Sequence, residues 1–314
     1  MKILVTGAAG FVGSTLLPRL IAAGHEVIGA RLPGDMPAGG APTGPVRWIT
    51  LDLRDSASVA SALETRPDAL IHLAAVASGA EARRDPGLAW EVNAAGTARL
   101  ADGFGRVREE GRGDPLLLLV STAEVYGAAP VPRLRQESDP VVPVSPYAAS
   151  KAAAELAVLE ASRRTGLRVI VARPFPHTGP GQTDRYAVPA FARRLADARR
   201  KKETRVRTGN LEPVRDFLDV RDVVEAYLAL VEKGQPGQIY NVASGEGRSL
   251  REIFARLAAI VGVDATPEVD PSLARSADLL HLVGDPTRLN RATGWTPRIP
   301  FDQTLQDLVH AQTD

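Results

Sequence analysis

The sequence predicts an α/β fold with a doubly wound parallel sheet and a smaller C-terminal region, and three observations lead to this prediction. Apolar, β-rich runs alternate with helical patterns over the first two-thirds of the chain, as in consecutive βαβ units. Several of these runs are almost entirely apolar, which is typical of strands that helices cover on both faces. After Arg173 the alternation stops and turn-rich segments such as PFPHTGPGQ begin, so we expect the second region to start there.

The expected elements follow from the period of the apolar residues and from the turn-forming residues between them. The expected strands are Lys2–Thr6, Glu26–Ala30, Val46–Leu51, Ala69–Leu73, Leu116–Ser121 and Leu167–Ala172. The expected helices are Val12–Ala23, Ser56–Glu64, Leu88–Glu110, Pro146–Thr165, Ala187–Arg200 and Asp222–Glu232. The segments 33–45 and 127–146 are rich in proline or glycine, and we expect loops there, the second acting as a flap beside a site.

Composition excludes several classes of protein. The 314 residues carry a net charge of +1 and 24% charged residues, so bulk charge favours neither nucleic acid nor a membrane surface as partner. The sequence has no long uncharged apolar run and no signal-peptide pattern before the first strand, so we expect a cytoplasmic protein without a membrane span. The absence of cysteine excludes disulfides and thiolate ligands, and we expect no metal site.

A glycine pattern follows the first expected strand and opens the first helix. Gly7, Gly10 and Gly13 would allow a tight turn, close approach of the backbone to a pyrophosphate, and close packing of helix on strand. An ordinary βα turn is the alternative interpretation. The strand before and the helix after favour a dinucleotide in a Rossmann-type fold, with Phe11 and Val12 at the helix N-terminus among its contacts.

Other candidate cofactor contacts come at the carboxyl ends of strands, where open α/β sheets bind ligands. Asp52 is expected to accept a hydrogen bond from an adenine amino group, although an Asp closing a strand is commonly a turn or cap residue. His72 at the end of the fourth run is interpreted as a structural histidine. The remaining expected contacts are Leu53, Leu73, Ala74, Ala75, Asn93 and Pro174.

The end of the second strand bears on the choice between NADP and NAD. Sites specific for NAD usually place Asp or Glu there, and this chain has Arg31. A guanidinium can pair with a 2′-phosphate through charge-assisted hydrogen bonds. We therefore expect NADP(H) to be favoured and NAD(H) to be possible, since Arg31 can also be a plain surface residue and Asp35 can reach a ribose from the loop.

Tyr147 and Lys151 lie four residues apart in SPYAASKAAAEL, so they share one face of the expected helix. A phenol and an ammonium so placed can move a proton while a dinucleotide moves a hydride. Such a pair also arises by chance on helices. The glycine turn upstream and Thr122 at the end of a strand favour a catalytic pair over a chance occurrence.

In chain order, TGAAGFVG, DL at 52–53, HLAA, VN at 92–93, STAEVYG and YAASK resemble the extended short-chain dehydrogenase/reductase family, in its branch that modifies nucleotide sugars. The resemblance implies a catalytic trio of Thr122, Tyr147 and Lys151. In that trio Lys151 bonds the nicotinamide ribose and lowers the pKa of the Tyr147 phenol. Tyr147 exchanges a proton with the substrate oxygen that Thr122 orients, and Tyr126 is expected to pack.

The second half, above all NLEPVRDFLDVRD, resembles GDP-4-dehydro-6-deoxy-mannose reductases and GDP-mannose 4,6-dehydratases. That resemblance implies that Arg215 and Arg275 contact a nucleotide diphosphate and that Thr122, Ala123 and His177 also contact substrate. Ion pairs with Asp216, Asp219 or Asp222 are the alternative for Arg215, and one with Asp278 is the alternative for Arg275. Two residues depart from the pattern: Pro176 replaces the usual Asn, and Ser276 a usual proline.

The expected activity is therefore NAD(P)H-dependent reduction of the C4 ketone of a nucleotide-diphospho 4-keto-6-deoxyhexose. A 4,6-dehydratase with Glu124 as base, a 4-epimerase and a non-catalytic dinucleotide-binding sensor or scaffold are the alternatives. We expect a homodimer through the helices 88–110 and 148–164. Residues 1–174 and 217–243 are expected to form the dinucleotide-binding domain, and 175–216 and 244–314 the sugar-nucleotide-binding domain.

Overall fold

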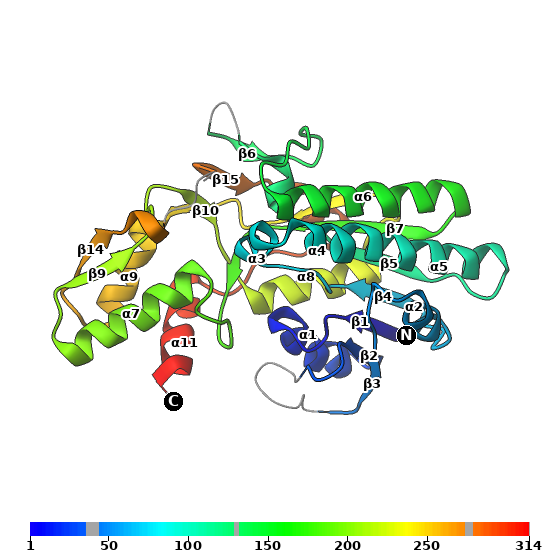
Figure 1. Ribbon diagram of the computed structural model, residues 1–314, viewed down its shortest axis with the longest axis horizontal. Coiled ribbons are helices and arrows are strands. Elements are labelled where there is room, and N and C mark those ends of the chain that lie inside the picture. The colour runs from blue at the N-terminus through cyan, green and yellow to red at the C-terminus, as the bar shows by residue number, and fades with distance from the viewer. Residues whose placement is uncertain (36–43, 129–131, 274–278, 314) are drawn as a thin grey trace.

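The computed structural model describes residues 1–35, 44–128, 132–273 and 279–313, and a seven-stranded parallel sheet lies at its centre (Figure 1). The strand order is β12-β7-β5-β4-β1-β2-β3. The strands are β1 (Lys2–Thr6), β2 (Glu26–Arg31), β3 (Val46–Thr50), β4 (Ala69–His72), β5 (Leu116–Val120), β7 (Arg168–Pro174) and β12 (Ile239–Val242). The chain builds outward in one direction from β1 and in the other from β4, so the switch of direction lies between β1 and β4, where such sheets bind ligands.

Alternate residues of the strands supply two apolar cores, one on each face of the sheet. Ile3, Val5 and Leu118 face α1 (Phe11–Ala22) and α8 (Val220–Lys233). Their neighbours in the strands belong to the core on the other face, against α2 (Ser56–Leu63), α5 (Thr97–Glu109) and α6 (Pro146–Thr165). This period of two explains the almost wholly apolar sequences of the inner strands, because helices cover both faces of the sheet there. The prediction of a doubly wound α/β fold is confirmed.

The predicted strands and helices are present with ends displaced by one or two residues, with one exception. The expected single helix Leu88–Glu110 is wrong: the structure has α4 (Pro86–Trp90), a π-helical turn (Glu91–Gly96) and α5. The π turn contains Asn93, whose side chain bonds outside the helix. Single π turns inside helices are frequent at functional sites. A short helix, α3 (Gly79–Arg84), precedes α4 and was not predicted.

A second region lies to one side of the large sheet (Figure 1). Its helices α7 (Ala187–Lys201), α9 (Leu250–Val261) and α11 (Phe301–Thr313) pack around a separate apolar cluster. Beside them β9 (Arg205–Thr208) pairs with β14 (Thr266–Val269), and β8 (His177–Thr178) pairs with β11 (Leu218–Asp219). A four-stranded sheet has the order β13 (Gly247–Ser249), β10 (Val214–Asp216), β15 (His281–Gly284) and β6 (Leu134–Arg135).

Two details bear on how the regions join. Strand β6 comes from the segment 127–146, yet it pairs with β15 of the later sequence. Helix α10 (Thr287–Thr293) contributes Leu289 to the core that contains β1 and α8. The division into two domains at the predicted boundaries stays a prediction. Within the residues that the structure describes, no helix is long and apolar enough to cross a membrane.

Candidate active site

The glycine turn between β1 and α1 has the geometry that its sequence requires. Gly7 has φ of +65°, and a Cβ atom there would lie 2.8 Å from the backbone nitrogen of Ala74. A Cβ atom on Gly13 would lie 2.5 Å from the carbonyl oxygen of Gly7. Gly10 caps α1 without a side-chain hydrogen bond, so the helix N-terminus presents backbone N–H groups beside this turn. This arrangement suits a phosphate group.

His72 at the end of β4 is a buried, fully bonded histidine, as interpreted from the sequence. Thr97 donates its hydroxyl hydrogen to the Asn93 carbonyl oxygen at 2.6 Å, so Nε2 of His72 must donate to Thr97, at 2.9 Å. Nδ1 then accepts from the Thr6 hydroxyl at 2.7 Å. Burial and the charge of Lys151 lower the pKa of His72 to about 3, so the ring stays neutral.

Asn93 joins the end of β4 to helix α6. Its amide oxygen accepts from the backbone nitrogen of Val76 at 2.7 Å, and its amide nitrogen donates to the Ser150 hydroxyl at 3.0 Å. Ser150 in turn donates to the carbonyl oxygen of Tyr147 at 2.8 Å. The structure thus shows Asn93 positioning the turn of α6 that carries Tyr147, and the predicted contact of Asn93 with a cofactor stays a prediction.

The residues predicted to contact the adenosine half of a dinucleotide have protein partners of their own. The Arg31 guanidinium lies 5.2 Å from the centre of the Trp48 ring and donates to the Asp35 carbonyl oxygen. Asp52 pairs with Arg54 at 2.7 Å, and this hydrogen bonding lowers the pKa of Asp52. A carboxylate has lone pairs for more than one donor, so this pair does not use up Asp52 as an acceptor.

Thr122 and Tyr147 meet at the carboxyl end of the sheet. Thr122 caps the 3₁₀ turn Ala123–Tyr126, and its hydroxyl accepts from the backbone nitrogen of Glu124 at 3.2 Å. Thr122 lies close enough to Tyr147 for its hydroxyl to lower the pKa of the phenol. Burial, Glu124 and Tyr186 raise that pKa more strongly, so the net direction is upward. The net pKa of the phenol thus lies above its usual value, because burial favours the uncharged form, and the lowering by Lys151 that the resemblance implies stays a prediction.

Lys151 follows Tyr147 by one turn of α6 and is only 3% exposed. Burial lowers the pKa of Lys151 to about 8, since the ammonium loses hydration, and the charge of Glu155 opposes this shift. The amine is thus in reach of titration near neutral pH, unlike an ordinary surface lysine.

A buried ion pair that the sequence analysis missed lies behind these residues. Glu155 on α6 accepts from Nη2 of Arg173 at 2.7 Å and from the Ser121 hydroxyl at 2.5 Å. Tyr126 packs beside it, as expected, with its ring centre 4.8 Å from the Arg173 guanidinium and its hydroxyl donating to Asn241 at 2.6 Å. The spacing of four residues from Lys151 to Glu155 was the available sequence signal.

The residues predicted to contact substrate come from different parts of the chain, and their contact with a substrate stays a prediction. The ring of His177 stacks on Phe11 of the glycine turn at 6.3 Å, and burial lowers the pKa of His177. Pro176, which replaces the usual Asn, accepts from the Leu218 backbone nitrogen at 2.9 Å through its carbonyl oxygen. Ala123 is buried in the cluster that contains Tyr126.

Arg215 lies on β10 and donates to the Val214 carbonyl oxygen at 3.0 Å. The Asp216 carboxylate accepts from the backbone nitrogens of Ser244 and Gly245 at 3.0 and 2.9 Å, which ties β10 to the end of β12. Asp219 binds Arg221, and Asp222 accepts from the Ile299 backbone nitrogen, so these carboxylates have partners of their own. Arg275, the second predicted phosphate-binding arginine, and Ser276 and Asp278 lie outside the described residues.

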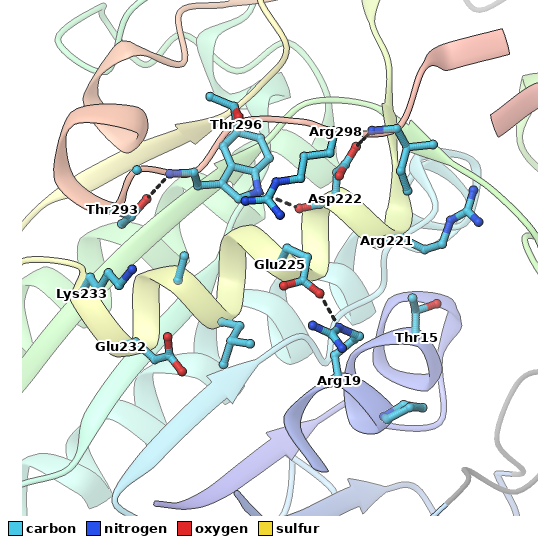
Figure 2. Close-up of a pocket in the computed structure, with 16 residues that line it drawn as sticks. Thr15, Arg19, Arg221, Asp222, Glu225, Glu232, Lys233, Thr293, Thr296 and Arg298 are labelled. Carbon is cyan, nitrogen blue, oxygen red and sulfur yellow. Dashed lines mark hydrogen bonds and ion pairs between the residues drawn. The ribbon is translucent and has the colours of Figure 1, made fainter. Parts of the chain in front are cut away.

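A separate cavity of about 600 Å³ lies between α1, α8 and the segment 293–299 (Figure 2). Arg19 and Glu225, which form an ion pair, line this cavity. Trp295 and Asp222 also line it, and the Trp295 indole donates to the Asp222 carbonyl oxygen at 3.0 Å. Among the residues that the structure describes, none of the predicted site residues lines this cavity, which has both acidic and basic side chains. It is distinct from the candidate active site.

The sequence and the fold of this chain are similar to those of known proteins. The model of the NAD dependent epimerase/dehydratase family matches residues 3–243. The GDP-6-deoxy-D-mannose reductase of Pseudomonas aeruginosa is 36% identical over 311 residues, which cover 98% of this chain and 96% of that protein. The structure of RMD from Pseudomonas aeruginosa complexed with NADPH is 33% identical, with a TM-score of 0.82 over 99% of this chain and 98% of that one. The UDP-glucose 4-epimerase of Thermus thermophilus in complex with NAD is 32% identical, with a TM-score of 0.87 over 99% of this chain and 98% of that one.

The neutral, buried state of His72 makes a prediction about stability. Its pKa in the folded chain is about 3, below its value of roughly 6.5 in an unfolded chain, so the unfolded state binds more protons as pH falls below 6.5. The contribution of this site to stability is present above pH 6.5 and declines on acidification. The stability advantage of the wild type over His72→Gln should therefore shrink by about 2 kcal/mol between pH 7 and pH 5.

Urea unfolding of both proteins at the two pH values measures this advantage. An advantage of equal size at pH 7 and pH 5 would contradict the assignment of a neutral His72.

Proposed function

This chain belongs to the NAD dependent epimerase/dehydratase family, and we propose that it reduces the C4 ketone of a nucleotide-diphospho 4-keto-6-deoxyhexose with NADPH. We propose the GDP-mannose-derived ketone, GDP-4-dehydro-6-deoxy-D-mannose, as the substrate. The similarity to a GDP-6-deoxy-D-mannose reductase along nearly the whole of both chains supports this choice. The observation that carries the proposal is the placement of Tyr147 and Lys151 one turn apart on α6, with Thr122 close enough to Tyr147 to act on the pKa of its phenol.

The pKa shifts at the site suit the reductive direction. Because burial raises the pKa of Tyr147, its phenol carries a proton at neutral pH and can give it to the substrate oxygen. Thr122 can donate a hydrogen bond to the same oxygen and hold it beside the phenol. The pKa of Lys151 is about 8, so its amine can change protonation near neutral pH. It can hydrogen-bond the nicotinamide ribose, and its protonation can change together with that of Tyr147. NADPH, when bound, supplies the hydride.

The residues that would hold the cofactor fit a dinucleotide. Gly7 and Gly13 allow the tight turn and its close packing, because a Cβ atom at either position would meet backbone atoms, and the N-terminus of α1 beside this turn is suited to a pyrophosphate. Phe11, Val12, Leu53, Leu73, Ala74, Ala75, Asn93 and Pro174 are the further proposed contacts. Arg31 supports NADP(H) over NAD(H), since its guanidinium suits a 2′-phosphate.

Glu124 favours a second candidate within the same family. Its charge acts on the Tyr147 phenol, so the carboxylate lies near the proposed reacting atoms. A carboxylate so placed can serve as the base that a 4,6-dehydratase needs for elimination of water. Incubation with GDP-mannose and NAD(P)⁺ separates the two: a dehydratase would form the 4-keto-6-deoxy sugar, and a reductase would leave GDP-mannose unchanged.

We also propose a homodimer. Leu156 on α6 is 70% exposed and Trp90 on α4 is 47% exposed, and both are large apolar side chains on neighbouring helices of one face. Association through α4, α5 and α6 would remove them from water. Sedimentation of the wild type and of Leu156→Asp tests this proposal, and an unchanged monomeric mass for both would contradict it.

The first prediction concerns the proton donor. Tyr147→Phe should lower kcat by ~10²–10⁴-fold, because the phenol is the proposed proton donor. Binding of NADPH, followed by fluorescence, should change little, since the glycine turn and Lys151 remain. Near-normal turnover by Tyr147→Phe would show that the proton comes from another group.

The second prediction concerns the cofactor. NADPH should be preferred to NADH, and Arg31→Ala should reduce this preference more than tenfold, chiefly through KM, because a charge-assisted contact contributes roughly 1.5–3 kcal/mol. Arg47→Ala is the matched control, since Arg47 is exposed on the neighbouring strand β3. Equal kcat/KM for the two cofactors in the wild type would contradict the role given to Arg31.

The third prediction concerns the substrate. Arg215→Ala should raise KM for the nucleotide sugar strongly and leave cofactor binding unchanged, since a phosphate would lose its cationic partner. Arg251→Ala on α9, an exposed arginine paired with Glu212, is the matched control.

The test of the proposed substrate mixes the protein with GDP-4-keto-6-deoxymannose and NADPH, and follows absorbance and product. Turnover with a UDP- or dTDP-linked ketosugar and none with the GDP-linked one would keep the reaction and overturn the GDP assignment.

A further inference from the structure

Three titratable side chains form a row along the inner face of α6. Tyr147, Lys151 and Glu155 follow one another at intervals of four residues, so they lie on the same side of the helix. Lys151 is 3% exposed and Glu155 is 4% exposed. A buried carboxylate is costly unless it is paired and fully hydrogen-bonded, so its presence behind Lys151 calls for a physical explanation.

Glu155 is held in place from two strands. Nη2 and Nε of Arg173, on β7, donate to its two oxygens at 2.7 and 3.0 Å. The hydroxyl of Ser121, directly after β5, donates to Oε1 at 2.5 Å. The carboxylate therefore cannot turn away from the helix face, and it stays one helical turn beyond Lys151.

The groups around Lys151 come from several elements. From β4, His72 is close enough for Lys151 to lower the pKa of the ring, and His72 is neutral. From the turn after β5, Glu124 acts on Tyr147, and from β7, Arg173 pairs with Glu155. Burial lowers the pKa of Lys151 to about 8, and the charge of Glu155 raises it against that effect.

We propose that Glu155 is a positioning residue that keeps the Lys151 amine protonated at neutral pH, through a carboxylate locked behind it by Arg173 and Ser121. The catalytic meaning of this inference rests on the role of Lys151 in the proposed function. Arg173 and Ser121 hold the carboxylate, and Glu155 acts on the reaction only through Lys151. Removal of the carboxylate would leave Lys151 as a buried cation with a second buried cation, Arg173, on the same side of the sheet.

The direct test measures the protonation of Lys151 without any substrate. The sequence contains five lysines, Lys2, Lys151, Lys201, Lys202 and Lys233, so ¹³Cε-labelled lysine gives few NMR signals, and Lys151→Met assigns the one of interest. In Glu155→Gln the titration midpoint of Lys151 should fall by about one pH unit or more, as expected when a close opposite charge is lost.

Two further variants make the result specific. Glu160→Gln is the matched control, because Glu160 makes the same kind of pair with Arg164 on the exposed side of α6, and the Lys151 midpoint should stay at its wild-type value. The double variant Glu155→Gln/Arg173→Met also removes the cation that Glu155→Gln leaves unpaired, and it provides the test where the single variant does not fold. In the double variant the Lys151 midpoint should still lie below the wild-type value by most of the difference expected for Glu155→Gln.

An unchanged Lys151 midpoint in the folded single or double variant would overturn the inference. Recovery of the wild-type midpoint in the double variant would also overturn it, because the effect would then come from the unpaired Arg173. Under the proposed function, the alkaline limb of the kcat/KM profile should move to lower pH by the same amount as the midpoint. Because the NMR titration needs no substrate, a failure of the proposed reaction leaves this test intact.

Discussion

The parallel pairing of β1, β4, β5 and β7 is the constraint on which the candidate site depends. Parallel strands end at the same edge of a sheet, so the segments that follow them are brought together there although they are far apart in the chain. The glycine turn follows β1, the segment bonded by Asn93 follows β4, Thr122 follows β5, and His177 follows β7. The apolar strands that form this sheet have no catalytic side chains of their own; they supply the placement.

At the candidate site, the effect of burial on each polar group depends on whether that group has hydrogen-bond or ion-pair partners. His72 has a partner on both ring nitrogens and is neutral, so it positions the strand end and takes no charge. Lys151 is also buried and Tyr147 is partly buried, and their pKa values move in the directions that favour the uncharged forms. Glu155 is the opposing charge, and its own burial is offset by Arg173. The site thus separates groups that hold the geometry from groups whose protonation can change.

Much of this arrangement could be predicted from the sequence, and the exceptions have a common physical cause. The strands and long helices were recognisable because their apolar period is local. The π turn at Asn93 was not, because it depends on bonds to Val76 and Ser150 from other parts of the chain. The four-stranded sheet was missed because its strands are two to four residues long and pair across large separations. The net direction of the Tyr147 pKa could not be predicted, because burial is a tertiary property, whereas the spacing to Lys151 is local.

The central claim is that Tyr147, Thr122 and Lys151 serve hydride transfer to a sugar ketone, and an isotope experiment tests it most directly. The wild-type protein is incubated with GDP-4-keto-6-deoxymannose and NADPH carrying deuterium at the transferred position, and the product is analysed by mass spectrometry and NMR. Our account predicts a GDP-deoxyhexose with deuterium bound at C4 in a single configuration. An unlabelled product would contradict the account, and so would the absence of turnover with the GDP-linked ketone and also with UDP- and dTDP-linked 4-keto sugars when the protein has bound NADPH.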